Sequence, residues 1–422
     1  MTFKFTAAAT AIALFASGAV WADSNIIFRF NDPESEAMRA ALDEFEVENP
    51  DISVELQSFA WSEARQQFLR EAAVGEGPDV VHIAFVWPRD LGTAGALYPL
   101  NEFWEEAPLQ AGYDDFIASN LAIGADGGIY GVPWTTDTWA MLYRTDIMED
   151  AGITAPAKNW DELRDISRTI HEETGKIGFG FPAGSGVQST IWFLANYYWW
   201  SNGSALVKAD GDGFDVGITE AQIAEAMEYF DSYMKEGHNP QSMLGVTDWY
   251  DPAIIEGMTN GDQGVAIVPP QQAREIIAAY EKRHPGEEAP FISAMVPAGS
   301  EASSTHLGGR MLGINSNSDE PEAAWKLIEF LTRPEIIAKY YGNQFPAQQT
   351  PLAQIDFGAT MSGFAEQLAV ARTWGAYSDG PAQIGSMWNE TGRMFGSAFI
   401  GERSYDEAAE ELLNTVKDML DK

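Results

Sequence analysis

The sequence predicts an α/β fold that opens with a sheet of parallel strands. Three observations point to this fold class. First, short apolar runs alternate with amphipathic helical patterns in the order β-α-β-α-β over residues 26–85. Second, 45% of the 422 residues are apolar and 12% aromatic, which is the composition of a globular protein. Third, this length predicts two or three domains rather than one.

The first five elements follow from their apolar spacing. The strands are predicted at Ile26–Phe30, Ser53–Phe59 and Asp79–Phe85. The first helix follows a start signal at Asn31-Asp32-Pro33-Glu34, and the second spans Trp61–Val74. The first helix presents one apolar face, formed by Met38, Ala41, Leu42 and Phe45. Right-handed crossovers then make the three strands parallel.

Parallel sheets of this kind bind their ligands beyond the carboxyl ends of the strands. Three loops are therefore predicted to meet at one edge: Asn31-Asp32, Ala60-Trp61 and Val86-Trp87. Each carries a polar or large aromatic side chain. Asp32, Trp61 and Trp87 are accordingly candidates for contact with a small polar ligand.

The rest of the chain continues the α/β pattern. Residues 125–128 predict a hairpin turn, and Ile129–Tyr143 is an unusually long β-forming segment that could cross between two lobes. Helices are predicted at Asp161–Glu173, Glu220–Glu236 and Tyr405–Leu420, and a further helix starts at Asp319-Glu320-Pro321 and runs through Leu331. Buried strands are predicted at Val265–Val268 and Phe291–Val296.

Charge and composition exclude several functions. The 63 acidic and 25 basic residues give a net charge of −38, which repels nucleic acids and anionic membranes. The chain has no cysteine, so disulfides, thiolate metal sites and a lipidated N-terminal cysteine are excluded. The five histidines do not have zinc-binding spacing, and we expect neither a metal nor a cofactor.

Residues 1–22 predict a secretory signal peptide. Lys4 precedes an apolar stretch from Phe5 to Val20, and cleavage is expected after Ala22. The alternative is a membrane anchor, but the apolar run falls short of the ~20 residues needed to span a bilayer. We therefore expect export without lipid anchoring.

Several short motifs, in their order along the chain, resemble one protein family. They are Gly77-Pro78-Asp79-Val80-Val81, Tyr130-Gly131-Val132-Pro133, Asn159-Trp160-Asp161-Glu162-Leu163, His306-Leu307-Gly308-Gly309 and the run from Ala323 to Leu331. Together they are similar to the family 1 extracellular solute-binding proteins of bacterial ABC importers, a group that includes maltose- and trehalose-binding proteins.

The resemblance implies a type II periplasmic-binding-protein fold. Each of two lobes would hold a mixed, mostly parallel sheet flanked by helices, and the chain would cross the hinge three times. The implied lobes are residues 23–136 with 297–342, and 137–296 with 343–422. The crossings are expected near Thr135–Thr138, Met295–Pro297 and Tyr341–Phe345, with ligand held between the lobes.

Asp137 is the leading candidate for ligand binding. It lies at the expected hinge, where a carboxylate can accept hydrogen bonds from two sugar hydroxyls. The alternative is an aspartate bonded to neighbouring backbone. Proteins of the family often use this position for ligand.

Other candidates surround Asp137. Trp61, Trp87, Trp139, Trp249, Tyr250 and Trp374 could stack on sugar rings, although most of the 14 tryptophans must be core. Gly308 and Gly309 would allow close approach of backbone N–H groups to the ligand. Arg310 could bond a sugar oxygen or pair with a carboxylate. Gln271 and Phe345 complete the predicted set.

The resemblance therefore implies a monomeric periplasmic carrier, not an enzyme, that delivers its ligand to a membrane permease, and the aromatic-rich candidate site favours a neutral mono- or oligosaccharide or polyol as that ligand. Two alternatives remain open: a carrier for a polyol phosphate or osmolyte, and a secreted glycoside hydrolase. The second is weaker because no pair of carboxylates stands out. No Walker or GxSxG motif is present, and the Asp210–Asp215 segment lacks the residues of a calcium loop.

Overall fold

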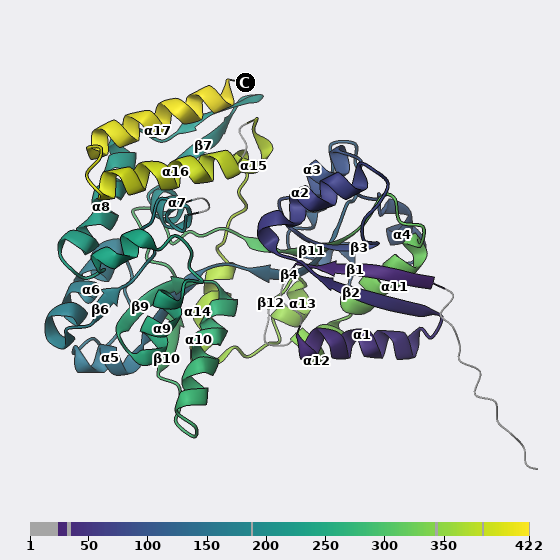
Figure 1. Ribbon diagram of the computed structural model, residues 1–422, viewed down its shortest axis with the longest axis horizontal. Coiled ribbons are helices and arrows are strands. Elements are labelled where there is room, and N and C mark those ends of the chain that lie inside the picture. The colour runs from purple at the N-terminus through teal and green to yellow at the C-terminus, as the bar shows by residue number, and fades with distance from the viewer. Residues whose placement is uncertain (1–23, 32–34, 187–188, 342–344, 382–383, 422) are drawn as a thin grey trace, which may run out of the picture.

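Two α/β lobes lie side by side in the computed structural model (Figure 1). The structure describes residues 24–31, 35–186, 189–341, 345–381 and 384–421. The predicted signal peptide and the candidate Asp32 lie outside the described residues.

The first lobe is built on a six-stranded sheet with the order β12-β4-β11-β3-β1-β2. Its strands are β1 (Ser24–Phe30), β2 (Ile52–Ser58), β3 (Val80–Ala84), β4 (Val132–Asp137), β11 (Gly308–Ile314) and β12 (Phe345–Pro346). β1 is parallel to β2 and β3. β11 is antiparallel to both β3 and β4, so β1 to β4 all run in one direction. The predicted parallel β-α-β-α-β unit is confirmed.

Helices cover both faces of this sheet. They are α1 (Glu36–Glu48), α2 (Trp61–Ala72), α3 (Pro88–Thr93), α4 (Asn101–Glu106), α11 (Pro321–Leu331), α12 (Pro334–Tyr341) and α13 (Gln349–Leu352), with 3-10 turns η1 (Tyr113–Asp115) and η2 (Ser119–Ala122). One core packs α1, α11 and α12 against the sheet, and a second packs α2 and α3 against the opposite face.

α1 illustrates how the sequence builds the lobe. The four residues of its predicted apolar face are all buried: Met38, Ala41, Leu42 and Phe45. The predicted start is wrong, because the helix begins at Glu36. Ser35 is the N-cap, and its hydroxyl accepts a hydrogen bond from the Met38 amide at 3.1 Å.

The second lobe is built on a four-stranded sheet with the order β10-β5-β9-β6. Its strands are β5 (Ala140–Arg144), β6 (Ile177–Phe179), β9 (Gln263–Val268) and β10 (Phe291–Ala294), and β7 (Ala205–Asp210) and β8 (Gly213–Gly217) form a separate hairpin. Its helices are α5 (Thr145–Asp150), α6 (Trp160–Thr174), α7 (Ile191–Ser201), α8 (Glu220–Lys235), α9 (Pro252–Asn260), α10 (Pro270–Arg283), α14 (Gly358–Leu368), α15 (Ala376–Asp379), α16 (Ile384–Phe399) and α17 (Tyr405–Leu420), with the 3-10 turn η3 (Gln241–Gly245).

The chain passes between the two sheets at three places. The long β-forming segment Ile129–Tyr143 crosses between the lobes as expected, because it forms β4 in the first sheet and β5 in the second, with Thr138 and Trp139 between them. The chain returns between β10 and β11, and leaves again between β12 and α14, which packs on β10. Phe345 pairs with Thr136, so β12 belongs to the first sheet.

Hydrogen bonds join the segments that cross between the lobes. The Thr138 hydroxyl donates to the carbonyl oxygen of His306 at 2.7 Å and lies 2.6 Å from the Thr305 hydroxyl. Residues 305–307 also exchange backbone hydrogen bonds with Arg372, from the segment between α14 and α15. The crossings therefore form one connected structure rather than independent linkers. Among the described helices, none is both long and apolar enough to cross a membrane.

Candidate ligand-binding site

The candidate site lies where the carboxyl ends of β1, β3 and β4 meet the hinge. Asp137 is the last residue of β4 and faces Gly308, the first residue of β11. β11 runs antiparallel to β3 and β4, so it begins at the edge where they end. The sheet topology thus brings residues far apart in sequence to one point between the lobes.

Asp137 and Arg310 form the polar centre of this edge. One guanidinium nitrogen of Arg310, Nη1, donates to the Asp137 Oδ2 at 3.2 Å. Both side chains are partly exposed, at 27% and 28%. Arg310 therefore pairs with a carboxylate, which is one of the two roles expected for it. Both side chains also keep solvent-exposed surface that can make further hydrogen bonds.

Gly308 and Gly309 are required by close packing around this pair. A Cβ on Gly308 would lie 2.1 Å from the Asp137 Oδ1. Gly309 has φ +151° and a Cβ there would lie 2.4 Å from the Phe85 ring and 2.5 Å from the Thr135 carbonyl oxygen. The glycines thus let the Asp137 carboxylate and the neighbouring strand approach the β11 backbone.

Trp61 and Trp87 meet at the same edge, as the loop positions predict. Their ring centroids are 5.3 Å apart. The Arg310 guanidinium carbon lies 4.4 Å from the centroid of the Trp61 ring, a cation–π arrangement. The third predicted loop reaches this edge through Asn31, which is buried and donates from its side-chain amide to the His82 carbonyl oxygen.

The second lobe contributes an aromatic cluster around Phe193 of α7. The ring centroids of Trp139, Trp249, Trp374 and Trp388 lie 4.4, 5.4, 6.1 and 5.0 Å from that of Phe193. Trp139 and Trp374 are buried, while Trp249 and Trp388 are partly exposed. Tyr250 adjoins Trp249 and is 38% exposed, so Trp249, Tyr250 and Trp388 have more surface for a ligand than the two buried rings.

The remaining two predicted residues lie in different surroundings. Gln271 is exposed in the first turn of α10. Phe345 is 2% exposed and stacks on Phe357 with centroids 4.4 Å apart, so it packs as a core residue.

His306 is a neighbour of Asp137 that the sequence reasoning placed in a motif but not in the site. Its Nε2 lies 3.9 Å from the Asp137 Oδ1, and its Nδ1 lies 2.7 Å from the Tyr197 hydroxyl. Burial lowers the pKa of His306 to about 4, against the opposing effect of Asp137, so the ring is neutral near pH 7. Burial, with Asp137 adding to it, raises the pKa of Tyr197 well above its usual value.

Arg274 is a second cation near the site that the sequence did not single out. It lies on α10, one turn from Gln271, and is partly buried. Burial lowers its pKa to about 10, and the charges of Tyr250 and Asp137 oppose this shift. Arg274 therefore remains charged at neutral pH and shares an electrostatic environment with Asp137.

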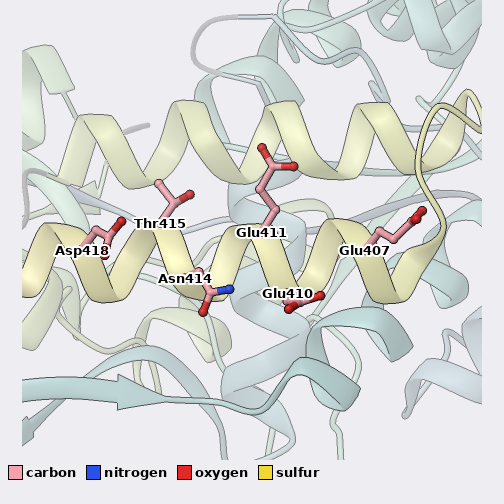
Figure 2. A pocket seen from close by; sticks show the side chains of 6 residues that line it. All are labelled: Glu407, Glu410, Glu411, Asn414, Thr415 and Asp418. Carbon is pink, nitrogen blue, oxygen red and sulfur yellow. The ribbon is translucent and has the colours of Figure 1, made fainter.

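A shallow pocket lies far from this edge, on the surface of α17 (Figure 2). It has a volume of about 360 Å³, is open to solvent and is lined by Glu407, Glu410, Glu411, Asn414, Thr415 and Asp418. Glu407 is held by the Ser404 capping box, and Glu411 pairs with Arg393 and Arg403. Glu407 and Glu411 thus have structural partners. Within the described residues, no group of three or more His, Asp or Glu could hold a metal ion.

Comparisons with known proteins agree with the two-lobe architecture. A model of the bacterial extracellular solute-binding protein family matches residues 31–338. A binding protein of Brucella abortus (strain 2308) is 27% identical over 337 residues, covering 78% of this chain and 77% of that protein.

Two solved structures share the fold. The GacH receptor of Streptomyces glaucescens, described unliganded and in complex with acarbose, is 21% identical with a TM-score of 0.79, covering 94% of this chain and 99% of its own. An ABC transporter solute-binding protein of Thermotoga lettingae, bound to α-D-tagatose, is 22% identical with a TM-score of 0.78 and the same coverage. The chain belongs to the family of bacterial extracellular solute-binding proteins and has their two-lobe α/β fold.

Proposed function

We propose that the protein captures a neutral carbohydrate or polyol between its lobes and delivers it to the permease of an ABC importer. The observation that carries the proposal is the Asp137–Arg310 pair, partly exposed and bordered by indole rings at the interlobe edge. This arrangement offers charged acceptors and donors beside apolar ring surface, which matches the alternating hydroxyl and C–H faces of a sugar.

Each side chain has a definite role in this proposal. Asp137 accepts hydrogen bonds from two ligand hydroxyls, and Arg310 donates to a ring or hydroxyl oxygen. Trp249 and Tyr250 provide a stacking surface from the second lobe. Trp61 acts differently, because the Arg310 guanidinium already covers one face of its ring.

The same proposal includes the setting of the protein. Residues 1–22 direct export, and the mature chain acts as a monomer in the periplasm without a lipid anchor. The lobes follow the two sheets, so the first lobe extends to Asp137 and includes β12, beyond the boundaries at residues 136 and 342 that the sequence suggested. Hinge closure encloses the ligand. Binding without chemical conversion is the activity of this transport family.

One observation favours a second ligand class. Arg274 adds a partly buried positive charge that interacts electrostatically with Asp137, so a sugar that bears an anionic group, such as a polyol phosphate, would be attracted to it. This ligand class is the alternative that the experiment must separate from a neutral sugar.

A thermal-shift screen of the mature protein tests the proposal. The panel contains maltose, trehalose, α-D-tagatose, sorbitol, glucuronate, glycerol 3-phosphate, glycine betaine and glutamate. Tight binding to the folded state raises the melting temperature by mass action. We expect a neutral sugar or polyol to give the largest increase. An increase with only glycerol 3-phosphate or glucuronate would favour the anionic alternative, and one with only betaine or glutamate would contradict the carbohydrate proposal.

A further inference from the structure

The segment that follows β3 contacts the second lobe through one apolar and one charged side chain. Val86 packs against the core of the second lobe. Three residues later, the Arg89 Nη1 lies 2.7 Å from the Asp379 Oδ1. This ion pair joins α3 of the first lobe to α15 of the second, at the place where the two lobes approach each other in Figure 1.

Both ends of the ion pair are fixed to their own lobes. α3 is held in the first lobe by the buried Pro88 and Leu91, and the Arg89 Nε donates to the Ile123 carbonyl oxygen at 3.4 Å. On the other side, Tyr377 of α15 is 1% exposed, and its hydroxyl lies 2.7 Å from the Asn196 Oδ1 and 2.6 Å from the Leu206 amide. Neither residue can move with the opposite lobe, so separation of the lobes would break the Arg89–Asp379 contact.

We propose that the Arg89–Asp379 ion pair acts as an electrostatic latch. In the absence of ligand it stabilises the closed arrangement of the lobes, in which α3 and α15 are in contact. The chain has 63 acidic residues and only 25 basic ones, so repulsion among its carboxylates opposes the approach of the lobes. An opposite-charge pair at the rim offsets part of that repulsion. The proposal concerns the hinge and does not depend on which ligand the protein binds.

The size of the effect follows from the exposure of the pair. Arg89 and Asp379 are 46% and 47% exposed, so solvent screens their attraction. Exposed ion pairs of this kind shift an equilibrium by roughly 1.5- to 5-fold. Where the open and closed forms are close in free energy, a change of this size in the equilibrium constant alters the populations of both forms measurably.

The test measures the distance between the lobes in the ligand-free protein. The absence of cysteine in the chain allows two labels to be placed without background, for example through Glu76→Cys in the first lobe and Asp212→Cys in the second. Single-molecule energy transfer then gives the ratio of short to long distances. We expect Asp379→Arg and Arg89→Asp each to lower this ratio at least 2-fold in 0.1 M salt, and the double exchange Arg89→Asp/Asp379→Arg to restore it.

A matched control separates the latch from a general charge effect. Glu48 pairs with Arg333 at 2.8 Å within the first lobe, so Glu48→Arg makes the same charge change as Asp379→Arg without touching the rim. It should leave the ratio of distances unchanged. Asp379→Asn, which adds no repulsion, should lower the ratio less than Asp379→Arg, and its effect should shrink in 1 M salt. An unchanged ratio in both single reversals, or no recovery in the double exchange, would overturn the proposal.

Discussion

His306 is a buried, neutral histidine next to the Asp137 carboxylate. Burial lowers its pKa to about 4, with Asp137 opposing and Arg310 adding to that effect, and its Nδ1 lies 2.7 Å from the Tyr197 hydroxyl. In the unfolded chain the pKa returns to about 6.5. Only the unfolded state therefore takes up a proton as the pH falls from about 6.5 to about 4, and the free energy of unfolding declines over that range.

This linkage predicts a pH-dependent stability that His306→Gln reduces. The loss for wild type reaches at most about 3 kcal/mol at pH 4, since each pKa unit corresponds to about 1.4 kcal/mol. Urea unfolding at pH 7 and pH 4.5 measures it. His284, which is partly exposed and stacks on Tyr280, supplies the control substitution His284→Gln. Equal pH dependence in His306→Gln and wild type would show that His306 does not contribute.

Gly309 is expected to be intolerant of any side chain. Its φ of +151° and the 2.4 Å approach to Phe85 mean that Gly309→Ala must strain the backbone or displace β3 and β4. We expect a loss of about 1–3 kcal/mol in the free energy of unfolding. Gly112→Ala is the control, because its Cβ meets no atom within 4 Å. A similar melting temperature for the two variants would contradict this explanation.

At the residue scale, the sequence predicted several candidate residues of the site but not the residues that lie next to them in space. Trp61 and Trp87 were predicted to lie at one edge because loops after parallel strands meet there, and Asp137 was predicted from the hinge crossing that the family resemblance implies. Their neighbours His306 and Arg274 come from elements whose place beside the site depends on how the second lobe folds back on the first. No local pattern in the sequence encodes that placement.

At the scale of elements, Thr138 ties two hinge crossings together. Its hydroxyl is bonded to the carbonyl oxygen of His306 and the hydroxyl of Thr305, and its side chain is 1% exposed. Thr138→Val keeps the shape but leaves those groups without their partner, which costs about 1–3 kcal/mol. Thr138→Ser keeps the hydroxyl and should lose less. Chemical denaturation of both variants measures the difference, and equal stability would mean that the hydroxyl does not fasten the hinge.

Elements with strong periodicity were predicted almost residue for residue, and irregular ones were not. α17 spans Tyr405–Leu420 as expected, because a Ser404–Glu407 capping box begins it and an apolar face sustains it. By contrast, the long β-forming segment Ile129–Tyr143 was expected to cross between lobes, and it does so as β4 and β5, which belong to different sheets. Its uniform β-forming composition does not show where one strand ends and the next begins, because the sheet that each half joins depends on partners far away in the chain.

At the scale of the whole molecule, the net charge of −38 predicts a stability that depends on salt. The melting temperature should rise between dilute buffer and about 0.5 M NaCl, as the Debye length shrinks and repulsion among carboxylates is screened. Calorimetry over this range measures it, with sucrose of equal osmolality as the control for non-ionic effects. A flat response would mean that the charges are already spaced so that they do not repel.

The family resemblance and the two-lobe fold were predictable because the motifs span most of the chain. The ligand was not, because sugar recognition depends on the distances between side chains from both lobes. The proposed function therefore depends most on Asp137 acting as the principal acceptor for ligand hydroxyls.

Isothermal titration calorimetry of wild type, Asp137→Asn and Asp137→Ala tests that claim most directly, using the neutral sugar that gives the largest thermal shift. Hydrogen bonds to a charged group contribute about 1.5–3 kcal/mol each, so the loss of two bonds in Asp137→Ala should weaken binding by at least ~10²-fold. Asp137→Asn should be intermediate. The ligand-free melting temperatures should stay close to that of wild type, because the carboxylate is partly exposed and supports no core packing. Wild-type affinity in Asp137→Ala, or a loss that merely follows unfolding of the ligand-free variant, would contradict the account.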